Sequence, residues 1–491
     1  MPETIFDVIV IGGGPAGATV AALLAAWGRS VVVFHGESEA PGLAESLPSS
    51  TRKLLGFLGQ LTTVDAASFH PNEGNISHWA ERDAVASTEV AGYHVSRPDF
   101  DRVLRDHARA QGAVLLNAHV RRVDQSSPVL VEASGPDGAT SCRGRFVLDC
   151  SGRTGVIARR GLRRAESGYR TLAVAAEWSC DNWPPGERAH TVVESYRDGW
   201  AWSVPLSPLK RQCTVMLDAD RTTIRKSDLE RLYSEELQKA RNIGARLAGS
   251  KKIGPVWACD ASVYDSVKAF DGDALLVGDA ASFVEALSSG GVKKALSSAW
   301  TASVVINTCL ARPAMCDTAK AFHDRRERQV FGEYARWSTE FFREAADVYG
   351  DAFWTTRAEF GSAVASGGTP SDFDLERDAD VRITFERLRD SANICLARGP
   401  SLTFADAAVI EDREVVLREG VVVSGYETPL RFAAGVNLPE LIRLAPECRD
   451  MPSLAEAYER RVAAVDPREL LIGLSFLVTR GALSLTEPVS A

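Results

Sequence analysis

A glycine-rich turn near the start of the chain is the clearest place for chemistry. Gly12, Gly14 and Gly17 lie in the run Gly-Gly-Gly-Pro-Ala-Gly, between a short β-branched segment and a helix-forming segment. The first glycine of such a run permits a tight turn, the second lets the backbone approach a pyrophosphate, and the third allows close packing of helix on strand. The pyrophosphate then lies at a helix N-terminus, beside Pro15 and Ala16. The motif predicts a dinucleotide-binding site.

The segment after this helix departs from the usual dinucleotide pattern. An acidic residue is expected at the end of the second strand, where it binds the ribose 2′-hydroxyl. His35 stands there instead, and Glu37 follows two positions later. His35 is either a ribose contact or a surface residue at a strand end, and the sequence leaves both interpretations open.

A second glycine turn lies far along the chain. Asp279 follows a buried apolar run, and Gly290 and Gly291 precede a long apolar segment. Backbone N–H groups at the start of a helix carry partial positive charge and would stabilise a reduced, electron-rich ring. Simple capping of the helix by residues 288–291 is the alternative interpretation.

These motifs together resemble one known family. FAD-dependent halogenase-like monooxygenases share, in this order, IGGGPAG, Glu45-Ser46, Arg97 in RPDFDRVL, DCSGR at 149–153, VGDAA at 277–281 and SSGG at 288–291, which covers roughly residues 5–310. The resemblance implies FAD as the cofactor. It implies that Asp279 contacts the ribityl–pyrophosphate region and that the later Ser-Gly turn lies beside the isoalloxazine. The cofactor-binding residues expected on these grounds are Gly12, Gly14, Pro15, Ala16, Gly17, His35, Glu45, Ser46, Arg97, Asp279, Gly290 and Gly291.

A tryptophan pair follows the same resemblance. The segment GWAWSVP at 199–205 is similar to the GWxWxIP segment of flavin halogenases, whose tryptophans lie between the flavin and substrate chambers. Strand alternation places Trp200 and Trp202 on one face. Core packing explains such a pair equally well, and related flavoproteins that do not halogenate carry the segment too. We expect both side chains at the substrate chamber, without a decision on the reaction.

Asn72 separates this chain from the halogenases it resembles. They carry a lysine, in an F-x-x-K-x-G…W context, that handles the hypohalous species, whereas the matching segment here begins at Phe69 and has Asn72 at the lysine position. An amide has no ammonium group and cannot form a haloamine in the same manner. Lys53 falls in a predicted helix, and Lys293 and Lys294 follow the glycine turn, where we expect solvent exposure. The sequence therefore disfavours halogenation.

The expected reaction is aromatic hydroxylation. Without halide, C4a-hydroperoxyflavin, formed from reduced FAD and O2, delivers its distal oxygen to an electron-rich ring. A branch of the resembled family hydroxylates a tryptophan in a precursor protein during maturation of quinone cofactors, and carrier-bound or free aromatic metabolites are equally open as substrates. The sequence does not choose a catalytic base. The candidates are Glu177, Glu194, His78, His94 and Glu285.

The source of electrons is expected to be a separate NAD(P)H flavin reductase. No second GxGxxG motif follows a strand, and DCSGR differs from the Asp-Gly motif by which one-component hydroxylases engage NADPH. Three other functions stay open: a flavin-dependent halogenase, a geranylgeranyl-reductase-like dehydrogenase or saturase that moves hydride without oxygen insertion, and a flavin-binding regulator without turnover.

The elements that must position these residues predict an α/β fold. Residues 5–11, 16–27 and 30–34 form a strand, a helix and a strand, which is one parallel βαβ unit of the Rossmann type. We expect a FAD-binding domain with an inserted β-rich substrate domain and a mainly helical C-terminal region that contains a small β element at 414–435. The expected bounds are 1–168 and 266–330 for the FAD-binding domain, 169–265 for the substrate domain and 331–491 for the C-terminal domain, with a linker at Ser366–Asp372.

The composition of the chain argues against two classes of binding partner. A net charge of −9 without long runs of like charge gives no electrostatic footprint for nucleic acid or an anionic membrane. The apolar N-terminal run lacks the features of a signal peptide, and no stretch reaches the length of a membrane span. The nine cysteines include no Cys-x-x-Cys pair and suit reduced thiols in the cytoplasm, and we expect no metal site.

Overall fold

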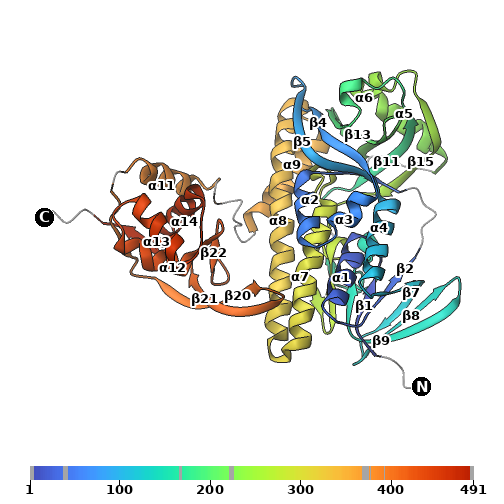
Figure 1. The fold of residues 1–491 in the computed structure, drawn as a ribbon. Coiled ribbons are helices and arrows are strands. Elements are labelled where there is room, and N and C mark those ends of the chain that lie inside the picture. The colour runs from blue at the N-terminus through green and yellow to red at the C-terminus, as the bar shows by residue number, and fades with distance from the viewer. Residues whose placement is uncertain are drawn as a thin grey trace. The chain divides into compact units, whose positions relative to one another are not determined.

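The computed structural model of the chain contains two compact units. The first comprises Met1–Ala311 and His323–Ser366, and the second comprises Arg312–Phe322 and Gly367–Ala491. Glu37 and residues 368–372 of the predicted linker lie outside the described residues. The structure describes residues 5–36, 42–164, 168–220, 226–367, 375, 377–391 and 393–486 (Figure 1).

A mostly parallel sheet forms one layer of the first unit. Its apolar strand β1 (Ile5–Ile11) pairs in parallel with β2 (Val31–His35) on one side and with β9 (Gly138–Asp149) on the other. Strand β6 extends the sheet beyond β2, and β18 extends it beyond β9. Residues Val8–Ile11 are almost fully buried, as expected for a strand covered on both faces. The remaining bounds are β6 (Val114–Asn117), β7 (His119–Asp124), β8 (Val129–Gly135), β17 (Phe270–Asp271) and β18 (Ala274–Leu276).

The order of these strands fixes where a ligand can bind. Ile11, the last residue of β1, pairs with Phe34 on one side and with Asp149 on the other. The chain therefore leaves β1 in one direction and returns to it from the opposite one. In open α/β sheets the crevice at the carboxyl ends of the strands, at such a switch point, is the ligand site. The packed helices α1 (Pro15–Ala26), α4 (Arg97–Ala110) and α7 (Gly291–Ala311) accompany this sheet.

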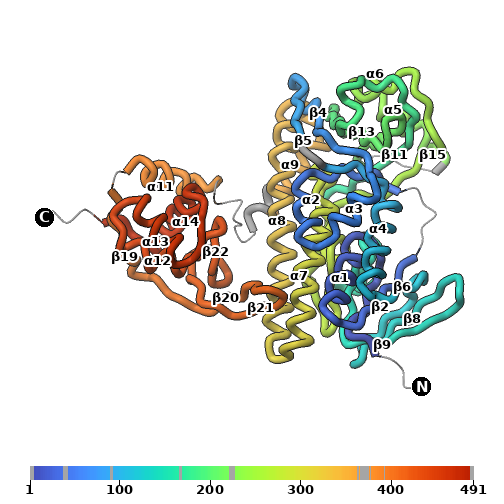
Figure 2. Tube along the Cα trace, in the orientation of Figure 1, coloured from blue at the N-terminus to red at the C-terminus, as the bar shows by residue number. Residues whose placement is uncertain are grey.

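A second, larger sheet has the strand order β15-β11-β14-β13-β12-β4-β5-β3. Figure 2 shows β4 and β5, in blue, beside the green strands β11 and β13. Strands β3, β4 and β5 come from residues that the sequence analysis assigned to the FAD-binding domain, and β4 joins the later strands through parallel pairing with β12. The strand bounds are β3 (Ala44–Leu47), β4 (His70–His78), β5 (Val85–Ser96), β11 (Thr171–Ser179), β12 (His190–Tyr196), β13 (Gly199–Ser207), β14 (Lys210–Asp218) and β15 (Lys251–Asp260).

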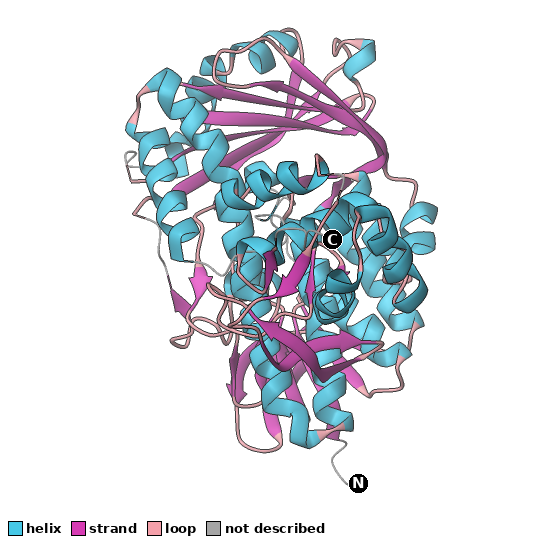
Figure 3. Cartoon of the chain, turned by 90° about the vertical axis from the view of Figure 1, so that its left-hand side faces the viewer, coloured by secondary structure: helices cyan, strands magenta, loops and turns pink. Residues whose placement is uncertain are grey.

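Apolar side chains cover both faces of this sheet. Helices α5 (Leu229–Lys239) and α6 (Arg241–Arg246) pack on one face around buried Tyr233. The other face carries an aromatic core that includes Trp79, Trp200 and Trp354. Figure 3 shows the long strands of this sheet with helices on either side. The unit also contains α2 (Ser49–Phe57), α3 (Leu61–Ala66), β10 (Arg163–Arg164) and β16 (Asp265–Ser266). Helices α8 (Cys316–Tyr349) and α9 (Ala352–Gly367) belong to it from His323 to Ser366.

The second unit has its own core, formed by buried leucines such as Leu388 and Leu441 together with Phe476. Its long hairpin pairs β20 with β21, of which β21 lies within the β element expected at 414–435 and β20 precedes it. The α/β class with a mainly helical C-terminal region is confirmed. The bounds are α11 (Ala379–Arg389), α12 (Leu438–Leu444), α13 (Met451–Arg461), α14 (Pro467–Thr479), β19 (Leu396–Arg398), β20 (Thr403–Glu411), β21 (Glu414–Val422), β22 (Phe432–Ala433), β23 (Val436–Asn437) and β24 (Leu483–Leu485).

Candidate active site

A cavity of about 550 Å³ lies where β1, β9 and β18 end. One end is formed by the first glycine turn, and we call it the nucleotide end. The other end lies against the second sheet, where Trp200 and Trp202 line the wall, and we call it the aromatic end. The cavity therefore joins the two sheets of the first unit.

The glycines of the turn have different roles in the structure. A side chain at Gly12, whose φ is +103°, would place its Cβ 2.3 Å from the carbonyl oxygen of Cys150. A Cβ at Gly17 would lie 1.9 Å from the carbonyl oxygen of Gly12. At Gly14, the residue before α1, the nearest atom would be 3.6 Å away. Gly12 and Gly17 thus let the turn pack tightly, whereas Gly14 leaves the backbone open to a ligand.

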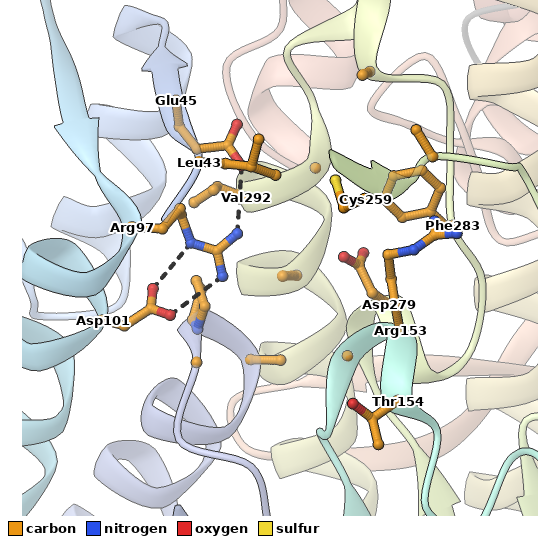
Figure 4. Close-up of a pocket in the computed structure, with 18 of the residues that line it drawn as sticks. Leu43, Glu45, Arg97, Asp101, Arg153, Thr154, Cys259, Asp279, Phe283 and Val292 are labelled. Atoms are coloured by element: carbon orange, nitrogen blue, oxygen red, sulfur yellow. Dashed lines mark hydrogen bonds and ion pairs between the residues drawn. The ribbon is translucent and has the colours of Figure 1, made fainter. Parts of the chain in front are cut away.

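Arg97 is held by carboxylates at the cavity wall. Its Nε donates to Asp101 Oδ1 at 3.0 Å, and its Nη1 donates to Glu45 Oε1 at 3.3 Å. Burial alone would lower the pKa of Arg97, but Asp101 and Glu45 raise it, so the guanidinium stays charged. Burial raises the pKa of the Glu45 carboxyl, and Arg97 opposes this rise. Figure 4 shows Arg97 on one side of the cavity and Asp279 with Arg153 on the other.

Asp279 lies in a loop that buried Lys294 fixes in place. Lys294 Nζ donates to the carbonyl oxygens of Gly278 at 3.0 Å and Ser282 at 2.6 Å, and lies 3.9 Å from Asp279 Oδ1. The expected solvent exposure of Lys294 was wrong, because these carbonyl oxygens bind its ammonium group in a site with no side-chain exposure. Asp279 Oδ1 has no hydrogen-bond partner within the described part of the chain. A buried carboxylate oxygen of this kind is expected to accept from a ligand or from an ordered water molecule.

The DCSGR segment builds the opposite wall. The Asp149 carboxylate accepts hydrogen bonds from the backbone N–H groups of Ile157 at 2.6 Å and Ala158 at 3.1 Å, so it orders the loop after β9. Arg153 lines the cavity, and its guanidinium lies 4.1 Å from the ring centre of Phe283. Arg153 also forms an ion pair with Asp260 at 3.3 Å.

Asn72 lies one layer behind the cavity wall. Its side chain is buried, its Nδ2 donates to Ser46 Oγ at 3.0 Å, and its Oδ1 accepts from the backbone N–H of Gly74 at 3.0 Å. Ser46 lines the cavity and also accepts from Thr191 Oγ1 at 2.9 Å. The amide therefore supports the wall through Ser46 and is not part of the lining.

Trp200 and Trp202 both line the aromatic end, on the same face of β13, with ring centroids 4.9 Å apart. Trp79 adds a third ring, 6.4 Å from Trp200. The indole Nε1 atoms of Trp200 and Trp202 have no hydrogen-bond partner among the residues that the structure describes. This end is thus an apolar wall with two N–H donors.

Most of the predicted site residues meet at this cavity, and four do not line it. Gly17 packs against the turn, and His35 ends β2. Gly290 packs against the Tyr334 ring, where a Cβ would come within 2.3 Å, and Asn72 lies behind Ser46. The predicted residues that do line the cavity are Gly12, Gly14, Pro15, Ala16, Glu45, Ser46, Arg97, Asp279, Gly291, Trp200 and Trp202.

The five candidate bases differ in whether they line the cavity and in the partners they already have. Glu177 forms an ion pair with Lys210 at 2.6 Å, and Glu194 accepts from the backbone of Ile243 at 2.9 Å. His94 is buried and contacts Thr191 Oγ1 at 3.0 Å, and burial holds its pKa well below the ordinary value. His78 does not line the cavity. Of the five, Glu285 alone lines it.

Sequence reasoning missed several lining residues. Asp101 lies one helical turn after Arg97, a spacing that marks an ion pair. Arg153 lies inside a motif that the sequence analysis quoted but did not assign to the site. His119 and Phe283 carry no local signal, because the fold alone brings them to the cavity.

Comparison with known proteins agrees with this geometry. The family model described as tryptophan halogenase matches residues 50–363. The chain belongs to the tryptophan halogenase family. A 1H-pyrrole-2-carbonyl-[peptidyl-carrier protein] chlorinase from Pseudomonas fluorescens is 27% identical over 343 residues, covering 62% of this chain and 76% of the relative. The flavin-dependent halogenase armH4 from Armillaria mellea is 25% identical over 470 residues, covering 83% of this chain and 88% of the relative.

Solved structures share the fold of this halogenase-family chain. CmlS, a flavin-dependent halogenase, superposes with a TM-score of 0.79 at 21% identity, covering 98% of this chain and 96% of that one. QhpG, a peptidyl tryptophan dihydroxylase essential for tryptophylquinone cofactor biogenesis, has a TM-score of 0.70 at 23% identity, covering 97% of this chain and all of that one. Each similarity extends over nearly the whole chain.

The chain is therefore a FAD-dependent oxidoreductase of a halogenase-like type, and the residues present fit this cofactor. Gly14 leaves the turn open at the start of α1 for a pyrophosphate, and charged Arg97 lies beside it. Asp279 Oδ1, which has no hydrogen-bond partner among the described residues, suits a hydroxyl donor such as those of the ribityl chain.

The structure also bears on the cysteines, membrane spans and metal sites considered from the composition. Cys309 and Cys316 are disulfide-bonded, so the expectation of nine reduced thiols was wrong for this pair, while the other seven cysteines form no disulfide. None of the described helices is both long and apolar enough to cross a membrane. No cluster of three or more potential metal ligands occurs among the described residues.

Proposed function

We propose that this enzyme is a FAD-dependent monooxygenase that hydroxylates an electron-rich aromatic ring, using reduced FAD and O2 as co-substrates. The observation that carries the proposal is the set of cavity-lining residues. Within the described part of the chain this set contains no lysine, and Asn72 occupies the position at which family halogenases carry one. An amide cannot replace an amine in halogen transfer.

The other nearby lysines do not supply the missing amine. Lys53 is exposed on α2, and Lys293 donates to Ser50 Oγ at 3.3 Å. Lys294 is buried, with its ammonium group bound by two backbone carbonyl oxygens. Releasing Lys294 would leave two buried acceptors without a donor, which costs about 1–3 kcal/mol for each. Lys294 therefore holds the Asp279 loop and takes no part in chemistry.

The residues of this chain divide the work between the two ends of the cavity. Gly12, Gly14 and Arg97 would bind the pyrophosphate, and Asp279 would bind the ribityl chain. A bound reduced flavin would supply two electrons and activate O2 for transfer to the ring. Trp200 and Trp202 would hold a flat aromatic substrate against an apolar wall, which excludes water from the site of transfer.

Tryptophan within a precursor protein or peptide is the substrate class that we favour. The peptidyl tryptophan dihydroxylase QhpG shares the fold along nearly the entire chain, which supports this class. A carrier-bound or free aromatic metabolite is the second class, supported by the relative that chlorinates a pyrrole on a peptidyl-carrier protein. Because DCSGR departs from the NADPH motif, a separate flavin reductase would supply the reduced cofactor.

Halogenation is the second candidate function, because the two curated relatives described above are named as a chlorinase and a flavin-dependent halogenase. It requires an amine, or another group that can carry the halogen, at the aromatic end.

The two functions differ in the mass of the product. Candidate aromatic compounds and tryptophan-containing peptides are incubated with the enzyme, FAD, a flavin reductase, NADH, oxygen and bromide, and the products are weighed by mass spectrometry. We expect a gain of one or two oxygen atoms and no bromine. Incorporation of bromine by the unmutated protein would refute the hydroxylase proposal. A parallel reaction without oxygen separates both functions from a dehydrogenase, which needs none.

A further inference from the structure

A second, much smaller cavity shares one wall with the large cavity. Its volume is about 20 Å³, and its polar lining residues include Tyr169, Glu285, Ser338 and Arg357. Glu285 and its neighbour Val284 line both cavities. The carboxyl group of Glu285 therefore lies at the boundary between the aromatic end and a small space with room for one water molecule.

The polar atoms around this space are incompletely bonded. Glu285 is only 5% exposed, and its Oε2 accepts from the backbone N–H of Ala286 at 3.2 Å. Its Oε1 has no hydrogen-bond partner among the residues described, and the same holds for Ser338 Oγ, on a side chain that is 2% exposed. Buried polar groups in folded proteins are nearly always hydrogen-bonded, to protein or to ordered water. A water molecule in the small cavity would serve both atoms, as donor to the carboxyl oxygen and as partner of the hydroxyl.

Charged neighbours set the protonation of Glu285. Burial raises its pKa above the ordinary glutamate value, while Arg357 and, more weakly, Arg153 oppose that rise. Tyr169, the third titratable neighbour, is itself buried, and its pKa is raised well above the usual value by burial and by Glu285. Arg357 is anchored by hydrogen bonds to Phe353 O and Thr171 Oγ1, each at 2.8 Å, so its charge stays in place. Because the net effect is a raised pKa, the Glu285 carboxyl gains and loses its proton at a pH nearer neutral than an exposed glutamate does.

The position of Glu285 places it close to the substrate wall. The next two residues, Ala286 and Leu287, pack against the aromatic core that contains Trp79 and Trp200. Both residues also line the large cavity. A ring held against Trp200 and Trp202 would therefore lie on the same side of the cavity as this carboxyl.

We propose that Glu285 is the catalytic acid–base residue of the aromatic end, and that the small cavity behind it holds one water molecule bound by Glu285 Oε1 and Ser338 Oγ. This proposal rests on the monooxygenase function. Hydroxylation forms a C–O bond and breaks the C–H bond at the same ring carbon. The Glu285 carboxylate accepts the proton from that carbon, and the electron pair of the broken bond restores the aromatic ring. Reduced FAD supplies two electrons and two protons. One of these protons stays on the oxygen that joins the ring, and the other combines with the proton given up by Glu285 on the second oxygen atom of O2, which leaves as water.

Infrared spectroscopy tests the protonation of Glu285 without turnover. Difference spectra of the FAD-loaded protein are recorded as the pH is lowered, and they report the C=O stretch of each carboxyl that becomes protonated. Glu45 and Asp265 also have raised pKa values and contribute bands of their own. Among the bands that titrate above the ordinary glutamate pKa, we expect one that disappears in Glu285→Gln and persists with a shifted midpoint in Glu285→Asp. Spectra unchanged by Glu285→Gln would overturn the assignment. In Ser338→Ala the midpoint of this band is expected to move, and an unmoved midpoint would overturn the water site.

Kinetics test the catalytic role. With a tryptophan-containing peptide that the unmutated enzyme oxidises, Glu285→Gln is expected to lower kcat by about 100- to 10,000-fold, the usual effect of losing a general acid or base. Glu285→Asp should recover part of kcat with an altered pH profile, and FAD affinity should stay unchanged in both variants. Unchanged kcat in Glu285→Gln would contradict the proposal. If the unmutated enzyme oxidises no aromatic probe, the monooxygenase function fails, whereas the infrared titration still decides whether Glu285 is a proton-exchanging carboxyl.

Discussion

The two ends of the large cavity are built on different principles. At the nucleotide end, the Gly12–Gly17 turn and the charged pair Arg97–Asp101 come from short segments in which neighbouring residues act together. At the aromatic end, Trp200 and Glu285 come from distant segments, and each has a side-chain polar atom without a protein partner within the described residues. The first end is constructed to bind a cofactor common to a whole family. The second is where members of that family can differ in the reaction they perform.

The largest effect is expected at the nucleotide end. Gly14→Val should lower FAD affinity by at least about 100-fold, because a side chain there would occupy the space of the pyrophosphate. Within the protein itself the new Cβ meets nothing closer than 3.6 Å, so folding should be retained. Gly17→Val is the matched control, and its Cβ, 1.9 Å from a carbonyl oxygen, should impair folding itself. Flavin titration and thermal melting measure both, and stoichiometric flavin in Gly14→Val would mean that the motif is only a turn.

A second variant sharpens the comparison between the two lysines that follow the later glycine turn. Lys294→Met should lower the free energy of unfolding by about 2–3 kcal/mol, because it leaves the Gly278 and Ser282 carbonyl oxygens buried without a donor. Lys293→Met, which removes only a 3.3 Å contact with Ser50, should change it by less than about 0.5 kcal/mol. Chemical denaturation measures both values. Equal stabilities for the two variants would contradict the structural role of Lys294.

Asp279 should contribute to binding more than to folding. Asp279→Ala is expected to weaken FAD affinity by about 10-fold, since it removes a carboxylate oxygen that has no hydrogen-bond partner in the described protein. Asp279→Asn, which keeps an oxygen acceptor at this position, should lose less. Unchanged affinity in Asp279→Ala would remove this residue from the cofactor site.

The last prediction concerns the pH dependence of stability at β16, the strand beneath the Asp279 loop. Burial raises the pKa of Asp265 to about 6, against the opposing effects of the Ser266 N–H and Arg164. Because the folded state binds this proton more tightly than the unfolded state, stability is full below about pH 4 and is lost as the pH rises to about 6. Asp265→Asn should remove this loss and gain about 3 kcal/mol at pH 7 relative to pH 4. A pH-independent difference between the two proteins would contradict the shift.

The contrast between the two ends also explains what the sequence could predict. The turn at Gly12–Gly17, strand β1 and helix α1 were readable because each depends on local spacing and hydrophobic period. The membership of β3, β4 and β5 in the second sheet was not readable, since it depends on the parallel pairing of β4 with β12 across more than a hundred residues of chain. The same pairing carries Asn72 behind Ser46.

Individual side chains show the same limit. The sequence marked Lys294 as exposed because it follows a glycine turn, yet the fold buries it under the Asp279 loop. It could not choose Glu285 from five candidate bases, because only the assembled cavity shows which of them reaches the substrate wall.

The central claim is that the aromatic end transfers oxygen and not halogen. The most direct measurement supplies isotopically heavy O2 and bromide together to the enzyme, FAD, a flavin reductase, NADH and a tryptophan-containing peptide, and determines the mass of the product. This account predicts heavy oxygen in the indole ring and no bromine. Bromine in the ring, formed by the protein with Asn72 unchanged, would contradict it.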